Sequence, residues 1–139
     1  MGYKMLVIDD DLGVLDMVGD YFRFCGFQVH TAEDGLSGIE ICQSMRPDVI
    51  LLDLRLRRMH GSEAVPYFRN IVPGAKIFVV SGHSEDLQEN RISGLAVDGY
   101  FEKPVLISEL QTAIQSALNK PAVPSRQLRR AFDFEFSVS

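Results

Sequence analysis

The sequence has no long apolar run and only two cysteines, and these absences exclude several classes of protein. No window of its 139 residues approaches the 18 apolar residues of a membrane span. The first residues also lack the basic stretch and apolar run of a secretion signal, so we expect a cytoplasmic protein without a membrane partner. Cys25 and Cys42 match no metal-binding spacing, and we expect two reduced cysteines in the core.

Signatures of nucleotide and nucleic-acid binding are missing as well. The chain contains neither a G-x-G-x-x-G motif nor a Walker loop. Residues 1–119 carry 10 Lys and Arg against 17 Asp and Glu, a net charge of −7, which argues against nucleic-acid binding by this part. Residues 120–139 carry 4 basic against 2 acidic residues, and we expect a solvated linker there, with a nucleic-acid-binding arm as the alternative.

The histidines do not form a recognisable site. His30, His60 and His83 stand at unrelated positions without ligand spacing, so we expect surface or loop residues. Ser81 has no histidine at a defined supporting position, which argues against a Ser-His-Asp nucleophile.

What the chain does contain is a regular alternation of apolar runs and amphipathic segments. With 46% hydrophobic and 24% charged residues, its composition is that of one globular domain. Short apolar runs predict five strands, at 4–8, 27–31, 48–52, 76–80 and 99–101. The third and fourth runs are continuously apolar, as in strands that are covered on both faces.

Helical spacing of apolar residues lies between and after these runs. It is clear at 11–25, 34–45 and 106–118 and weaker at about 61–71 and 85–93. Asp10 or Asp11 can cap the first helix, and Gly26 can end it. The expected packed faces contain Leu12, Leu15, Val18, Phe22 and Cys25 in the first helix and Leu36, Ile39, Cys42 and Met45 in the second.

Strand and helix alternate five times, which predicts an α/β fold. We expect a doubly wound, five-stranded parallel sheet with five helices and right-handed crossovers. In such sheets ligands bind beyond the carboxyl ends of the strands. Those ends carry the chemically notable residues of this chain: Asp9, Asp10, Asp11, Asp53, Ser81 and Lys103.

Several carboxylates that converge on one ammonium group are unfavourable unless a cation joins them. Mg²⁺ prefers oxygen ligands, keeps several waters, and needs only one or two carboxylates with a backbone carbonyl. The residues therefore predict a magnesium site at this edge of the sheet.

Four stretches in this order resemble the receiver domain of bacterial two-component response regulators. They are VIDDD after the first strand, DVILLDLRLRRMHG around the third, VVSGH at the fourth and GYFEKP at the fifth. The resemblance covers about residues 1–119, and it implies the flavodoxin-like receiver fold.

The resemblance implies a role for each matching residue. Asp53 is similar to the phosphoacceptor, which takes a phosphoryl group from a histidine kinase or phosphotransfer protein. Asp9 and Asp10, with Asp53 and the backbone carbonyl of Arg55, resemble the magnesium ligands. The implied phosphoryl-binding and switch residues are Ser81, Gly82, Lys103 and Tyr100, and Pro104 typically follows a cis peptide bond in this family.

A phosphorylation-dependent switch is the function that this resemblance implies. It changes the surface of the fourth helix, fifth strand and fifth helix, which can meet an output domain or a second copy. Its only chemistry is its own phosphorylation and dephosphorylation. The alternatives are a magnesium-dependent phosphatase with an aspartate nucleophile, which usually has a second acid where this chain has Arg55, and a binding module that is not phosphorylated.

Two features depart from the family or lie outside it. Arg57 stands where the family often has proline, and His60 where it often has an acidic or polar residue, whereas Gly61 matches. In residues 120–139, two prolines precede an alternation of Phe132, Phe134, Phe136 and Val138. This tail is interpreted as a linker toward an output module or a non-native end, or else as a strand that docks on the domain or a partner.

Overall fold

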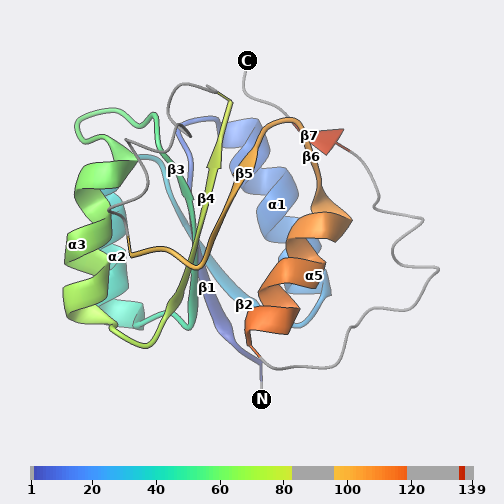
Figure 1. Ribbon diagram of the computed structural model, residues 1–139, viewed down its shortest axis with the longest axis horizontal. Coiled ribbons are helices and arrows are strands. Elements are labelled where there is room, and N and C mark those ends of the chain that lie inside the picture. Colours follow the sequence, from blue (N-terminus) through green and yellow to red (C-terminus); the bar gives the residue numbers. More distant parts are fainter. Residues whose placement is uncertain (1, 83–95, 119–134, 137–139) are drawn as a thin grey trace.

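Five parallel strands form the centre of the molecule (Figure 1). The computed structural model describes residues 2–82, 96–118 and 135–136. The sheet order is β2-β1-β3-β4-β5, and the strands are β1 (Lys4–Ile8), β2 (Gln28–Ala32), β3 (Val49–Asp53), β4 (Lys76–Ser81) and β5 (Gly99–Glu102). The predicted doubly wound parallel sheet is confirmed, and each strand begins within one residue of its predicted start.

Helices cover both faces of this sheet. Helices α1 (Leu12–Phe24) and α5 (Ile107–Ala117) lie on one face, and α2 (Gly35–Met45) and α3 (Gly61–Ile71) lie on the other (Figure 1). The helix expected at about 85–93 lies outside the described residues. Among the helices that the structure does describe, none is long and apolar enough to cross a membrane.

The strands are apolar on both faces because each face meets a helical layer. In β1, Met5 and Val7 pack toward α1 and α5, whereas Leu6 and Ile8 pack toward α2 and α3. All five residues of β3 are buried. Burying one such large apolar side chain stabilises the fold by roughly 1.5–3 kcal/mol. Because many of them pack on both faces of the sheet, the strands hold the residues at its edge in fixed positions.

Aspartates begin the first two helices. The Asp11 carboxylate accepts hydrogen bonds from the backbone N–H groups of Gly13 and Val14, at 2.9 and 3.2 Å, and caps α1. Asp34 caps α2 by accepting from the N–H of Ser37 at 2.9 Å. Gly26, predicted to end the first helix, follows it with a φ of 101°, which favours glycine.

Two apolar residues assigned to packed helix faces are exposed instead. Leu12, the first residue of α1, is 58% exposed, and Leu36 is 42% exposed. In α2 the buried face contains glycines that the hydrophobic pattern did not mark. A Cβ atom on Gly38 would lie 2.6 Å from the Cδ1 atom of Ile8, so the missing side chain lets α2 approach β1.

A buried polar contact joins α1 to α5. The hydroxyl of Tyr21 donates to the side-chain oxygen of Gln111, whose amide nitrogen lies 3.4 Å from the sulfur of Cys25. Cys42 is fully buried and Cys25 partly buried, both as free thiols, and burial raises the pKa of each to about 11. The expected core position is confirmed for Cys42, whereas Cys25 is only partly buried and packs against the core.

A second, small sheet involves the tail. Residues of β6 (Val105–Leu106), directly before α5, pair antiparallel with β7 (Glu135–Phe136). Figure 1 shows this pair beside the start of α5. The pairing is the one a docking strand would make, and the remainder of the tail beyond Leu118 lies outside the described residues.

Candidate phosphorylation and metal site

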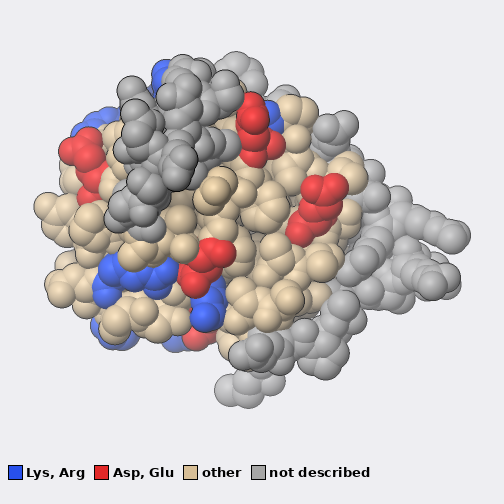
Figure 2. Space-filling model, in the orientation of Figure 1, with Lys and Arg blue, Asp and Glu red and all other residues tan. Residues whose placement is uncertain are grey.

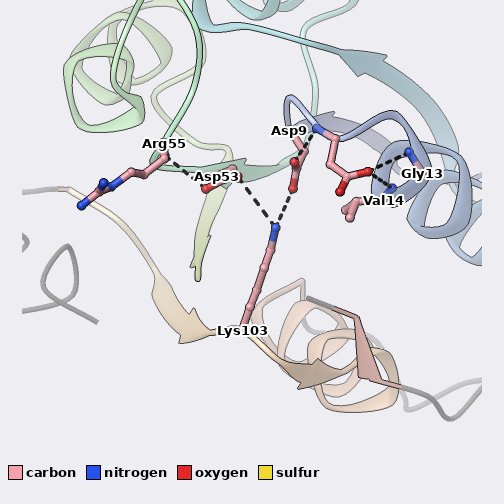
Figure 3. A network of polar contacts seen from close by, with 7 residues as sticks. Asp9, Gly13, Val14, Asp53, Arg55 and Lys103 are labelled. Atoms are coloured by element: carbon pink, nitrogen blue, oxygen red, sulfur yellow. Dashed lines mark hydrogen bonds and ion pairs between the residues drawn. The ribbon is translucent and has the colours of Figure 1, made fainter. Parts of the chain in front are cut away.

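The parallel register brings four strand ends to one edge of the sheet. Asp9 directly follows β1, and Asp53 ends the neighbouring strand β3. Ser81 ends β4, and Lys103 directly follows β5. Figure 3 shows the Lys103 side chain extending from its strand end toward Asp9 and Asp53. The fold therefore brings together the residues that the sequence analysis grouped at this edge of the sheet.

Three carboxylates lie close enough to share a cation. One oxygen each from Asp9, Asp10 and Asp53 can be chosen so that all lie within 4.8 Å of one another. Asp9 and Asp53 are each only 3% exposed, and Asp10 is partly buried. Oxygens on one octahedral Mg²⁺ lie at most about 4.2 Å apart, so only a small contraction of the group is needed.

The Lys103 ammonium group is the buried positive charge of the site. Its Nζ atom lies 2.7 Å from Oδ2 of Asp9 and 3.8 Å from Oδ2 of Asp53. The first distance is a charge-assisted hydrogen bond, whereas the second is an ion pair without one. Lys103 therefore bonds directly to Asp9, although the resemblance pairs it with Asp53 or its phosphoryl group.

The two oxygens of Asp53 have different surroundings. Oδ1 accepts a hydrogen bond from the backbone N–H of Arg55 at 3.1 Å. Oδ2 is buried and accepts no hydrogen bond from any residue that the structure describes. A buried carboxylate oxygen without a donor is costly, and a cation or an incoming phosphoryl group would compensate for that cost. This orphaned oxygen and the oxygen-only donor set fit Mg²⁺.

Burial governs the protonation of Asp53. Desolvation is the largest effect and raises its pKa to about 7, with Asp9 and Asp10 acting in the same direction. Lys103 and the Arg55 N–H lower the pKa but do not offset the desolvation. A group that ionises near neutral pH at the bottom of a carboxylate cluster is a candidate for phosphoryl chemistry.

Asp11 is not one of the three carboxylates that could share a cation. Its side chain caps α1, and its backbone N–H donates to Oδ1 of Asp9 at 2.9 Å. Asp11 thus orients Asp9 through the main chain.

The loop after Asp53 closes tightly over the end of β3. The N–H of Gly61 donates to the carbonyl of Leu54 at 2.6 Å. A Cβ atom at position 61 would lie 2.4 Å from the carbonyl oxygen of Asp53, so only glycine fits without a shift of the main chain. The sequence match at Gly61 therefore has a steric cause.

The other residues expected at the site lie around its rim. Ser81 is fully buried, and its carbonyl accepts from the N–H of Lys103 at 2.7 Å. Gly82 is exposed at the end of β4, and the Lys103–Pro104 peptide bond is cis, as the resemblance implies. Tyr100 is 55% exposed on β5, so its ring lies outside the carboxylate cluster.

Of the described histidines, His60 caps a helix and His30 lies on the surface. Nδ1 of His60 accepts from the N–H of Ser62 at 3.2 Å and caps α3, a role that the sequence pattern did not reveal. Residue Glu63 completes the capping box, which was the available sequence signal. His30 is exposed on β2, and His83 lies outside the described residues.

Surface charges are mixed on the face seen in Figure 2. Basic and acidic side chains are interspersed among uncharged ones over the part of this face that the structure describes. This distribution is in line with the acidic balance of the domain and differs from the basic surface typical of nucleic-acid binding.

Comparisons with known proteins agree with this geometry. The model of the response regulator receiver domain family matches residues 5–115. The probable transcriptional regulatory protein TcrX of Mycobacterium tuberculosis is 33% identical over 121 residues, which are 86% of this chain and 51% of that protein. Sporulation initiation phosphotransferase F of Bacillus subtilis is 28% identical over 120 residues, covering 85% of this chain and 95% of that protein.

A solved structure shows the same fold. A CheY-like response regulator receiver domain protein from Methanospirillum hungatei superposes with a TM-score of 0.81 at 25% identity, over 86% of this chain and 95% of the other. The chain therefore belongs to the response regulator receiver domain family. It spans only about half the length of relatives such as TcrX.

The raised pKa of Asp53 predicts a pH dependence of stability. The proton that folding favours on Asp53 stabilises the native state fully below about pH 4, and this stabilisation is lost as the pH rises through about 7. Asp53→Asn cannot titrate. In EDTA, the free energy of unfolding of the wild type should therefore fall between pH 5 and pH 8 by roughly 1–3 kcal/mol relative to the mutant. Urea unfolding of both proteins at the two pH values measures this difference, and parallel pH profiles would contradict the assignment.

Proposed function

We propose that this chain is a phosphorylation-dependent signalling switch that accepts a phosphoryl group on Asp53. The observation that carries the proposal is Oδ2 of Asp53, which is buried, accepts no hydrogen bond from the described residues and lies 3.8 Å from the Lys103 ammonium group. An anionic nucleophile beside a fixed positive charge and a carboxylate group suited to a divalent cation is what phosphoryl transfer requires.

The donor in this proposal is a phosphohistidine of a histidine kinase or phosphotransfer protein. An oxygen of Asp53 forms the new bond to phosphorus, and the bond from phosphorus to the histidine nitrogen breaks, leaving its electron pair on nitrogen. Lys103 stabilises the charge on the transferred group. Asp9 and Asp10, with the Arg55 carbonyl, would hold Mg²⁺, which when bound neutralises charge on the phosphoryl oxygens.

Membership of the family supports the coarse part of this proposal. The name of the Bacillus subtilis relative, a phosphotransferase whose length this chain nearly covers, supports the finer part. A phosphatase is less favoured, because position 55 holds an exposed arginine in place of a second acid.

Asp53→Asn should abolish labelling by acetyl phosphate, because the amide lacks the anionic nucleophile. Intact-mass measurement with Mg²⁺ should show one added phosphoryl group on the wild type and none on the mutant. Asp20→Asn, which removes an 80% exposed carboxylate that is not part of the cluster, is the matched control and should be labelled like the wild type. Equal labelling of Asp53→Asn would overturn the phosphoacceptor, and rapid catalytic consumption of acetyl phosphate would favour the phosphatase.

The switch part of the proposal assigns the readout to Ser81, Gly82 and Tyr100. A phosphoryl group adds charge and acceptor oxygens, which draw the Ser81 hydroxyl inward; Gly82 leaves room beside it. The exposed Tyr100 ring can then turn inward, so that one of two pre-existing surfaces at β5 and α5 becomes dominant.

Ser81→Ala should separate phosphorylation from this readout. The mutant keeps Asp53 and Lys103, so it should still be labelled, but its amide shifts around Tyr100 on addition of beryllofluoride should be smaller than in the wild type. Two-dimensional NMR spectra of both proteins, with Ser44→Ala on the exposed face of α2 as the control, make the comparison. The full wild-type pattern in Ser81→Ala would show that the hydroxyl is not part of the switch.

A further inference from the structure

The loop between β3 and α3 is attached to the start of α2 at a point the sequence did not reveal. One guanidinium nitrogen of Arg58, Nη2, lies 2.8 Å from each carboxylate oxygen of Asp34 and 3.4 Å from the Ser37 hydroxyl. The main chains also meet, because Asp34 and Arg57 form an isolated parallel bridge. We call the contact between Arg58 and Asp34 the latch.

Each partner of the latch has a constrained position: Asp34 caps a helix, and Arg58 has an unusual backbone conformation. Asp34 is already fixed as the cap of α2, and its pKa is lowered first by the Ser37 N–H and further by Arg58. Arg58 has a φ of 67°, in the left-handed region that residues other than glycine seldom adopt. An arginine held in this conformation needs a compensating contact, and the ion pair with Asp34 provides one.

Gly35 and Met59, which follow the two latch residues in the sequence, also bring the loop close to α2. A Cβ atom on Gly35 would lie 3.0 Å from the Cβ atom of Met59, so the glycine at the start of α2 makes room for the loop. With the hydrogen bond between Gly61 and Leu54 closing its ends, the loop is attached both at its base and at its middle.

This loop carries the groups that surround Asp53 on one side. The N–H of Arg55 bonds to Oδ1 of Asp53, and the carbonyl of Arg55 is the proposed metal ligand, three residues before Arg58. We propose that the latch is a positioning device: Arg58, through Asp34, holds the loop so that the Arg55 main chain is set for the cation. The inference rests on the proposed function for the cation site and adds Arg58 and Asp34 as positioning residues.

The direction in which the Mg²⁺ affinity changes distinguishes a positioning role of Arg58 from a purely electrostatic one. Removing a positive charge from the loop that follows Asp53 should, by electrostatics alone, leave the binding of Mg²⁺ unchanged or strengthen it slightly. Loss of the latch should weaken it, because the main-chain ligand is no longer fixed. Outer partners of metal ligands typically change metal affinity by about 10- to 100-fold, and we expect the lower end for this partly exposed pair.

Arg58→Ala should therefore raise the dissociation constant for Mg²⁺ about tenfold, as measured by isothermal titration calorimetry on the full chain. Arg57→Ala is the matched control, since it removes the same charge from the adjacent exposed position and leaves the latch intact. Its affinity should be unchanged or slightly higher. The thermal midpoint without Mg²⁺ should be at most slightly lower for Arg58→Ala than for Arg57→Ala, because an ion pair with an exposed arginine contributes little to stability.

A double mutant completes the test. Asp34→Asn keeps an oxygen that can cap α2 but removes the charged partner, so Arg58→Ala should have no further effect on Mg²⁺ affinity in that background. If the wild type binds Mg²⁺ and Arg58→Ala binds it as well as Arg57→Ala does, the latch is overturned and the proposed function stands. If the wild type itself does not bind Mg²⁺, the proposed function fails first.

Discussion

The buried hydrogen bond between the Lys103 ammonium group and Asp9 is the interaction on which the site depends. Lys103 is 5% exposed and Asp9 3%, and they lie on strand ends separated by 94 positions in the chain. One ammonium group cannot balance Asp9, Asp53 and the adjacent Asp10, so the ionised cluster retains negative charge in a poorly solvated place. Desolvation, together with the nearby Asp9 and Asp10, raises the pKa of Asp53, and a divalent cation at the cluster would offset the remaining negative charge.

The fold supplies the rigidity that this arrangement needs. Strands buried on both faces place Asp9 and Asp53 side by side, and tight main-chain contacts fix the residues just beyond each strand. Asp11 holds Asp9 through its N–H, Gly61 closes the loop after Asp53, and the N–H of Lys103 bonds to Ser81. A cluster assembled from flexible loops could relax by moving its charges apart; this one would have to protonate or bind a cation.

The strands and the grouping of the site residues could be predicted from the sequence, because they depend on the spacing of apolar residues and on the order of strands and helices along the chain. Continuous apolar runs marked the strands, and the rule that parallel strands end at one edge grouped Asp53 with Lys103. The sequence did not show that Leu36 would be exposed, since the packed face of α2 includes Gly35 and Gly38, which carry no hydrophobic signal. The Asp34–Arg58 contact was equally hidden, because it depends on one residue adopting a positive φ and joins positions 24 apart.

The central claim is that uncompensated burial, relieved by a cation, controls the ionisation of Asp53. A ¹³C NMR titration of the side-chain carboxyl groups, with the Asp53 signal assigned by its absence in Asp53→Asn, tests this directly. Without divalent cations the pKa of Asp53 should be about 7, and saturating Mg²⁺ should lower it because the ion favours the charged form. An ordinary aspartate pKa without metal, unchanged by Mg²⁺, would contradict the account.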